Sequence, residues 1–162
     1  MSPSIDDRWQ NKPMAEKVRG YAHRVDIAAD AGQVWRALTE PQSLTRWCSP
    51  EAELQPRQGG LFRACVDRVT ELEAHIDVFD AGRRLRLIYL PNPALPRADS
   101  VLTDDLIVES VPGGTVVRLL GSGVPGEPEW DTQYWRLRTS WLAALNRLKV
   151  FVEAQQRPGA AQ

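Results

Sequence analysis

The alternation of apolar and polar residues predicts a half-buried strand at residues 21–27. Tyr21, His23, Val25 and Ile27 fall on one face, and the residues between them fall on the other face. Residues 1–20 show no sustained period and carry one large apolar side chain, Trp9. We therefore expect an extension followed by the first strand of a domain.

Two short helices are predicted directly after this strand. Asp30 stands at an N-cap position, and Gln33 follows three residues later, the spacing of a capping box. Pro41 ends the first helix and is tolerated only at the start of another, so "EPQSLTRW" is the second. Their apolar side chains are expected to close one end of the space beneath a sheet: Val34, Leu38, Leu44 and Trp47.

Further strands are predicted across the middle of the chain, with turn residues between them and no helices. Such spacing is typical of an antiparallel meander. The predicted strands are 51–55, 61–67, 74–79, 85–90, 101–111 and 115–120.

A long helix is predicted from Pro128 onward, with carboxylates in its first turn. Its apolar stripe recurs at three- and four-residue steps, through Tyr134, Leu137, Trp141, Leu145, Leu148 and Val152. The pattern predicts an α+β domain, in which a sheet of six or seven antiparallel strands packs on this helix.

Several motifs together resemble a known family. "VDIAADAGQVWRALTEPQSLTRWCSP", "LQPRQGGLF", "PGGTVVRLL" and "SWLAALNRLKVFVE" follow one another in the order seen in the activator of heat-shock-protein-90 ATPase homologue family. That family belongs to the START/Bet v 1-like superfamily of polyketide cyclases, dehydrases and lipid-transport proteins. The resemblance implies the helix-grip fold, a curved sheet wrapped around the C-terminal helix. The chain departs from the family pattern at Gln55, Cys48 and Gly121.

The resemblance also suggests how the chain is divided. We expect an N-terminal extension at residues 1–20, a START/Bet v 1-like ligand-binding domain at residues 21–155, and a tail at residues 156–162. One domain is also what 162 residues favour.

Composition narrows the range of partners. The formal net charge of -1 gives no basic excess for nucleic acid, and no apolar run is long enough for a membrane span. With no secretory signal pattern, we expect a cytoplasmic protein in which Cys48 and Cys65 stay reduced.

Candidate chemistry is sparse. The two histidines, His23 and His75, are too few and too separated to predict a metal site, and no cofactor motif occurs. Alternation places Asp104 on the apolar face of its strand, although the opposite phase is also open. A carboxylate facing a cavity would suit proton transfer near neutral pH. Asp104 and His23 are thus candidate catalytic residues, and neither is assigned that role.

The superfamily binds apolar ligands in the cavity between sheet and helix, which makes this cavity the predicted site. We expect its entrance between "PNPALPRADS" and the start of the long helix, near Trp130, Tyr134 and Trp135. The predicted ligand-binding residues are Phe62, Ala64, Val66, Leu87, Tyr89, Leu106, Val117, Leu119, Trp130, Tyr134, Leu137 and Trp141.

The preferred hypothesis is a small cytosolic protein that binds an apolar or aromatic molecule of lipid or polyketide type, without turnover. A cyclase- or hydratase-like enzyme using a pocket Asp or His is the second hypothesis. A co-chaperone-like interaction module is the third, and a homodimer and a chaperone partner are left open.

Overall fold

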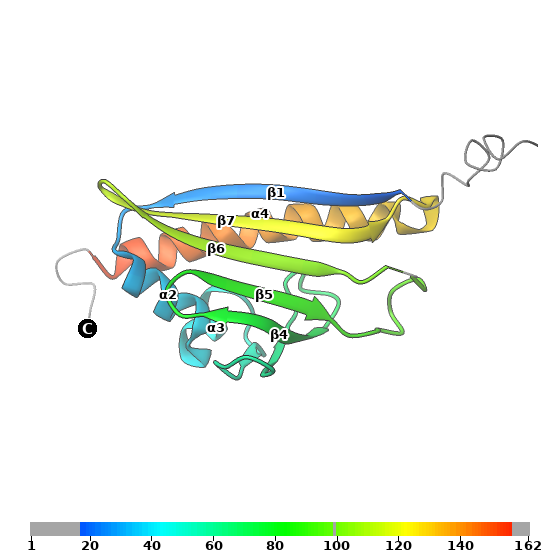
Figure 1. Ribbon diagram of the computed structural model, residues 1–162, viewed down its shortest axis with the longest axis horizontal. Helices are drawn as coiled ribbons and strands as arrows, with labels where there is room; N and C mark the ends of the chain where they lie inside the picture. Colours follow the sequence, from blue (N-terminus) through cyan, green and yellow to red (C-terminus); the bar gives the residue numbers. More distant parts are fainter. Residues whose placement is uncertain (1–16, 99, 157–162) are drawn as a thin grey trace, which may run out of the picture.

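The computed structural model describes residues 17–98 and 100–156, in which one curved antiparallel sheet covers a long C-terminal helix (Figure 1). The strand order is β1-β7-β6-β5-β4-β3-β2. This arrangement confirms the predicted helix-grip fold. The strands are β1 (Val18–Ile27), β2 (Glu53–Leu54), β3 (Leu61–Ala64), β4 (Leu72–Asp80), β5 (Arg84–Tyr89), β6 (Thr103–Val111) and β7 (Gly114–Pro125).

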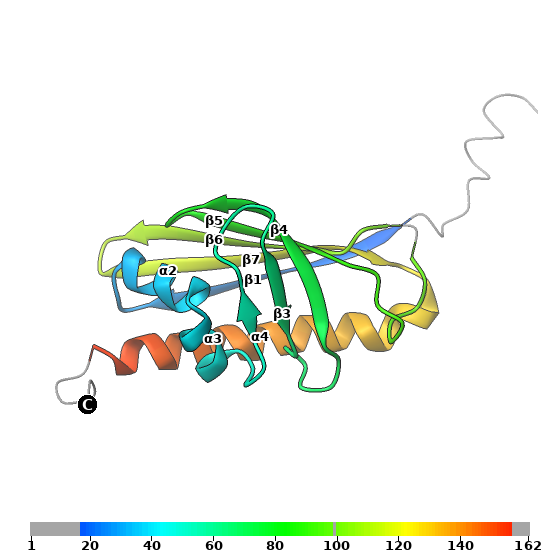
Figure 2. The same ribbon diagram turned by 90° about the horizontal axis from the view of Figure 1, so that it is seen from below.

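The long helix α4 (Asp131–Ala154) runs along one face of the sheet (Figure 2). A short 3-10 turn, η2 (Pro128–Trp130), precedes it. Pro128, which was predicted to begin the long helix, begins this turn instead. The side chains that α4 buries recur at three- and four-residue steps and so form one face of the helix. They are Leu137, Trp141, Ala144, Leu145, Leu148 and Val152.

Helices α2 (Ala31–Thr39) and α3 (Pro41–Trp47) follow β1 as predicted. The carboxylate of Asp30 caps α2 by accepting the backbone N–H of Gln33 at 2.8 Å. The side chain of Gln33 does not complete a capping box, because its Oε1 has no hydrogen-bond partner among the described residues. Four apolar side chains of these helices are buried, as expected for a cover at the end of the sheet: Val34, Leu38, Leu44 and Trp47.

Several strand boundaries differ from the predicted ones. Strand β3 is shorter than predicted, and the chain turns after it at Arg68, a residue with φ of 63°. Strand β7 is longer than predicted because Gly121 and Gly123 lie within it instead of ending it. Strand β1 begins at Val18, so two residues of the predicted extension, Val18 and Arg19, pair with β7, and Gly20 lies at a register shift.

The remaining parts of the predicted termini lie outside the described residues. These parts are residues 1–16, which include Trp9, and residues 157–162. No helix in residues 17–98 and 100–156 has the length and apolar character needed to cross a membrane.

Candidate functional site

A carboxyl group buried on the inner face of the sheet is the most unusual feature of the core. Asp104, on β6, is 1% exposed. The hydroxyl of Tyr21 on β1 donates to its Oδ1 at 2.7 Å, and the hydroxyl of Tyr89 on β5 donates to its Oδ2 at 2.7 Å. Three strands therefore bring one acid and two phenols together in an apolar interior.

The strand register explains how Tyr21 reaches Asp104 across an intervening strand. Gly121 on β7 is paired with Tyr21 on one side and with Asp104 on the other. A Cβ at position 121 would fall on the ring of Tyr21, so only glycine leaves room for that ring to lie across β7. Gly121 is also one of the departures from the family pattern, and no local feature of the sequence connects it with Tyr21.

Burial raises the pKa of Asp104 from 3.8 to about 7. The hydroxyls of Tyr89 and Tyr21 oppose this shift by donating to the charged form, and the nearby indole N–H of Trp141 does so too. The geometry of that indole falls short of a hydrogen bond, and its Nε1 has no acceptor among the described residues. The indole N–H of Trp141 is thus a donor beside the cluster with no hydrogen-bond acceptor among the described residues.

A small void borders the cluster. Its volume is about 10 Å³, roughly the space of one water molecule. Asp104, Tyr21 and Tyr89 line it together with apolar neighbours, so a larger guest could enter only if these neighbours moved. The remaining lining residues are Leu72, Leu102, Thr103, Ser122, Val124 and Leu137.

The structure places the predicted ligand-binding residues in or beside the core. One of them, Tyr134, is half-buried, with its hydroxyl donating to the carbonyl oxygen of Gly20 at 2.9 Å and Arg19 over its ring. Tyr89 and Leu137 touch the void beside Asp104. The buried ones are Phe62, Ala64, Val66, Leu87, Tyr89, Leu106, Val117, Leu119, Trp130, Leu137 and Trp141.

The predicted entrance near Trp130 needs correction. Trp130 is 1% exposed, and its indole Nε1 donates to the carbonyl oxygen of Arg97 in the proline-rich loop at 3.4 Å. Trp130 is therefore a core residue that joins the proline-rich loop to the start of α4, and it does not form an entrance. Trp135 is the aromatic side chain that faces outward there, at 55% exposure.

The second catalytic candidate, His23, contacts Tyr21, the hydrogen-bond partner of Asp104, and not Asp104 itself. Its ring is half-buried and stacks on Tyr21, with 5.7 Å between ring centroids. Its Nε2 lies 2.8 Å from the carbonyl oxygen of Arg138, to which a protonated Nε2 donates. His23 can reach Asp104 only through Tyr21.

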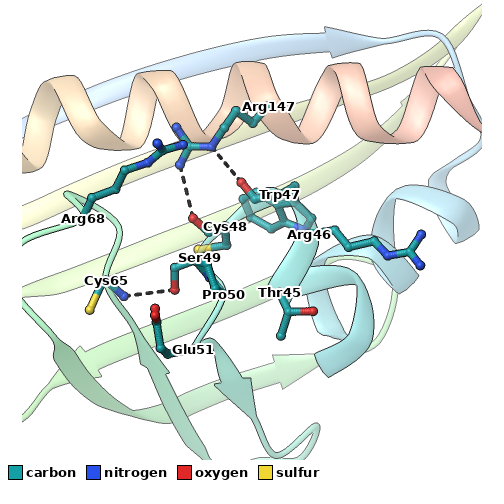
Figure 3. A pocket seen from close by; sticks show the side chains of 10 residues that line it. All are labelled: Thr45, Arg46, Trp47, Cys48, Ser49, Pro50, Glu51, Cys65, Arg68 and Arg147. Atoms are coloured by element: carbon teal, nitrogen blue, oxygen red, sulfur yellow. Dashed lines mark hydrogen bonds between the residues drawn. The ribbon is translucent and has the colours of Figure 1, made fainter.

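A larger pocket opens where α3, the β3–β4 loop and α4 meet (Figure 3). Its volume is about 430 Å³, within the usual range for small-molecule sites. The sequence did not predict this pocket, because its walls come from segments about 100 residues apart. Its lining residues are Thr45, Arg46, Trp47, Cys48, Ser49, Pro50, Glu51, Cys65, Arg68 and Arg147.

The two thiols of this pocket are free, and burial raises the pKa of Cys48 to about 12, which makes it a poor nucleophile. Burial and nearby carboxylates also raise the pKa of Cys65. Within residues 17–98 and 100–156, no group of three or more His, Cys, Asp or Glu side chains is arranged to hold a metal ion.

Comparison with known proteins identifies the family and supports the fold. The family model described as "Activator of Hsp90 ATPase homolog 1-like protein" matches residues 28–153. No curated protein matches the chain.

Three solved structures share the fold at low sequence identity. Protein MLL2253 from Mesorhizobium loti is 20% identical, with a TM-score of 0.72 over 83% of this chain and 97% of its own. The Aha1 dimer from Colwellia psychrerythraea is 18% identical, with a TM-score of 0.70 over 83% of this chain and 96% of its own. CalU16 from Micromonospora echinospora is 21% identical, with a TM-score of 0.66 over 89% of this chain and 82% of its own.

Proposed function

Because the chain belongs to the family of Activator of Hsp90 ATPase homolog 1-like proteins, we propose that it binds a mainly apolar or aromatic small molecule, of lipid or polyketide type, between its sheet and α4. The observation that carries this proposal is the Asp104 carboxyl group, held by Tyr21 and Tyr89 on the inner face of the sheet. These three residues supply the polar end of the site.

A core that served stability alone would be expected to hold apolar residues at these positions. Burying a carboxyl group is costly even when it is hydrogen-bonded, and replacing buried polar groups by apolar ones is often stabilising. Polar groups that converge in an apolar interior, with a shifted pKa, are instead typical of sites that orient a ligand. Asp104 and the tyrosines can accept from a hydroxyl of the guest, and the protonated carboxyl group or a tyrosine hydroxyl can donate to a hydroxyl or carbonyl oxygen of the guest.

Binding requires the interior to open, since the void beside Asp104 measures about 10 Å³. Leu72, Leu102 and Leu137 line this void, and such side chains can change rotamer with no loss of hydrogen bonds. An apolar guest would then contact these three leucine side chains in place of the contacts that they make with one another. The unpartnered indole N–H of Trp141 offers one further donor.

The proposal is tested by calorimetric titration with a panel of fatty acids, sterols and polycyclic phenols. At least one compound should bind, and Asp104→Asn should weaken the binding of hydroxyl-bearing compounds by about tenfold, the upper end of the scale for one lost hydrogen bond. Asp105→Asn is the matched control, because Asp105 lies next in sequence but pairs with Arg84 and Arg86. Equal weakening by both variants, or no binding by the whole panel, would contradict the proposal.

An enzyme is the second candidate, favoured by the pKa of Asp104, which burial raises to about 7. A group that titrates near neutral pH suits general acid–base catalysis, as in a cyclase- or hydratase-like reaction. His23 is the less direct candidate, since it contacts Tyr21 and not the acid. A rate that survives in Asp104→Asn, or that does not change with pH, would count against turnover at this site.

A protein-interaction role stays a proposal of lower rank. The Colwellia psychrerythraea neighbour was solved as a dimer, so homodimer formation here is measured by sedimentation equilibrium. A chaperone partner and a cytoplasmic location likewise remain predictions.

A further inference from the structure

The pocket of about 430 Å³ holds two arginines whose guanidinium groups point toward one another (Figure 3). Arg147 comes from α4, and Arg68 comes from the β3–β4 loop. Arg46 also lines the pocket, but its side chain points away from the other two (Figure 3). Glu51 is the carboxylate among the lining residues.

Arg147 is held in place by the end of α3. Its Nε donates to the carbonyl oxygen of Trp47 at 2.8 Å, and its Nη2 donates to the carbonyl oxygen of Cys48 at 3.3 Å. A guanidinium group carries more N–H donors than these two bonds use, so Arg147 is positioned and still able to bind an acceptor. Burial, followed by the charge of the nearby Arg68, lowers the pKa of Arg147.

Neither arginine has a carboxylate partner in the described part of the chain. The arginines of the outer sheet face differ in this respect: Arg84 and Arg86 both bind Asp105, and Arg63 lies near three glutamates. Arg68 also keeps a positive φ of 63°, a conformation that costs free energy in any residue but glycine. Two like charges brought together without a counter-charge are an arrangement that an anion would stabilise.

The pocket wall leads toward the interior cluster. Cys48 lines the pocket and is 3% exposed. Cys48 and Trp47, a second lining residue, both belong to the same buried apolar cluster as Tyr89. The pocket therefore borders the core that surrounds Asp104.

We infer that this pocket binds the acidic group of the ligand, with Arg147 and Arg68 contacting a carboxylate or phosphate oxygen and the apolar body directed past Cys48 into the core. The inference rests on the proposed function and specifies the ligand class, an amphipathic acid. An apolar compound without the acidic group would then bind, but more weakly.

The test compares octanoate with octan-1-ol, which share one chain length and differ in charge, by calorimetric titration at low ionic strength. Octanoate is expected to bind about 3- to 10-fold more tightly, as for one partly exposed charge pair. Arg68→Gln should remove this preference and leave octan-1-ol binding unchanged. Arg68 is exposed and has no ion-pair partner among the described residues, so the variant is expected to fold.

Arg46→Gln is the matched control, because it makes the same change of net charge at the same pocket. An equal loss of preference in both variants would show a general field effect and overturn the inference. Equal binding of both compounds to the unmodified protein would also overturn it, while leaving the proposed function intact. Binding of neither compound would overturn the inference, and titration with the wider panel then decides the proposed function.

Discussion

The substitution Asp104→Asn should change how stability depends on pH. Asp104 is protonated in the folded protein up to a pKa of about 7 because it is buried, whereas its ordinary value is 3.8. Between these two values the folded state holds a proton that the unfolded chain has released, so stability falls as pH rises. The contribution is fully present below about pH 4 and is lost as pH passes the folded-state pKa.

The size of this effect follows from the same two values. Each pH unit is worth about 1.4 kcal/mol, so a difference of about three units corresponds to about 4 kcal/mol. Asparagine has nearly the same shape and does not titrate. The unfolding free energy of Asp104→Asn, relative to the unmodified protein, is therefore expected to rise by about 4 kcal/mol between pH 4 and pH 8.

Urea titrations at several pH values, followed by tryptophan emission, measure this difference. Asp105→Asn is the control and should behave in the opposite sense. Burial raises the pKa of Asp105, but hydrogen bonds from Arg84 and Arg86 outweigh burial and lower it. The contribution of Asp105 to the free energy of unfolding is thus present at neutral pH and is lost in acid. A difference for Asp104→Asn that varies by less than about 1 kcal/mol over this range would refute the account of a buried, protonated acid.

Three further predictions test the packing. Trp47→Ala should cost about 3–5 kcal/mol in a urea titration, because the ring is 3% exposed and its Nε1 donates to the carbonyl oxygen of Ala37 at 2.8 Å; a loss below about 1 kcal/mol would contradict the buried position. Trp130→Ala should cost a similar amount of unfolding free energy to Trp141→Ala, since both rings are 1% exposed. A loss of less than half that of Trp141→Ala would indicate that Trp130 lies at an entrance and not in the core. Gly121→Ala should cost about 1–3 kcal/mol by displacing the ring of Tyr21. Because the Tyr21 hydroxyl lowers the pKa of Asp104, its loss should raise that pKa further and extend the pH dependence to higher pH; an unchanged thermal midpoint and pH profile would show that the ring adapts.

The elements of the fold could be predicted because their signals are local. The alternation from Tyr21 to Ile27, the cap at Asp30 and the proline at position 41 each lie within the element that they specify. The predicted strand ends were less accurate at glycines, because glycine occurs both in turns and inside strands. Gly113 ends a turn with φ of 87°, whereas Gly123 has the same φ inside β7, and sequence alone does not separate these cases.

The candidate site could be predicted only in part, because it depends on pairing between distant strands. Alternation placed Asp104 on the apolar face as one of two phases. Its partner Tyr21 lies 83 residues earlier and reaches it only because Gly121 lies between them in the sheet. The contact of Arg147 with the end of α3 spans 100 residues in the same way. Such contacts follow from register and helix docking, which no short stretch of the chain encodes.

The most direct test of the proposed interior site is the indole resonance of Trp141 in a proton–nitrogen NMR titration with 2-naphthol, an aromatic compound with one hydroxyl. Trp141 is buried beside Asp104 and its N–H has no acceptor among the described residues, whereas Trp135 is exposed and reports on nonspecific contact. The account predicts a saturable shift of the Trp141 resonance with little change at Trp135. A Trp141 resonance that stays fixed, or that moves only in proportion to Trp135, would contradict binding between the sheet and α4.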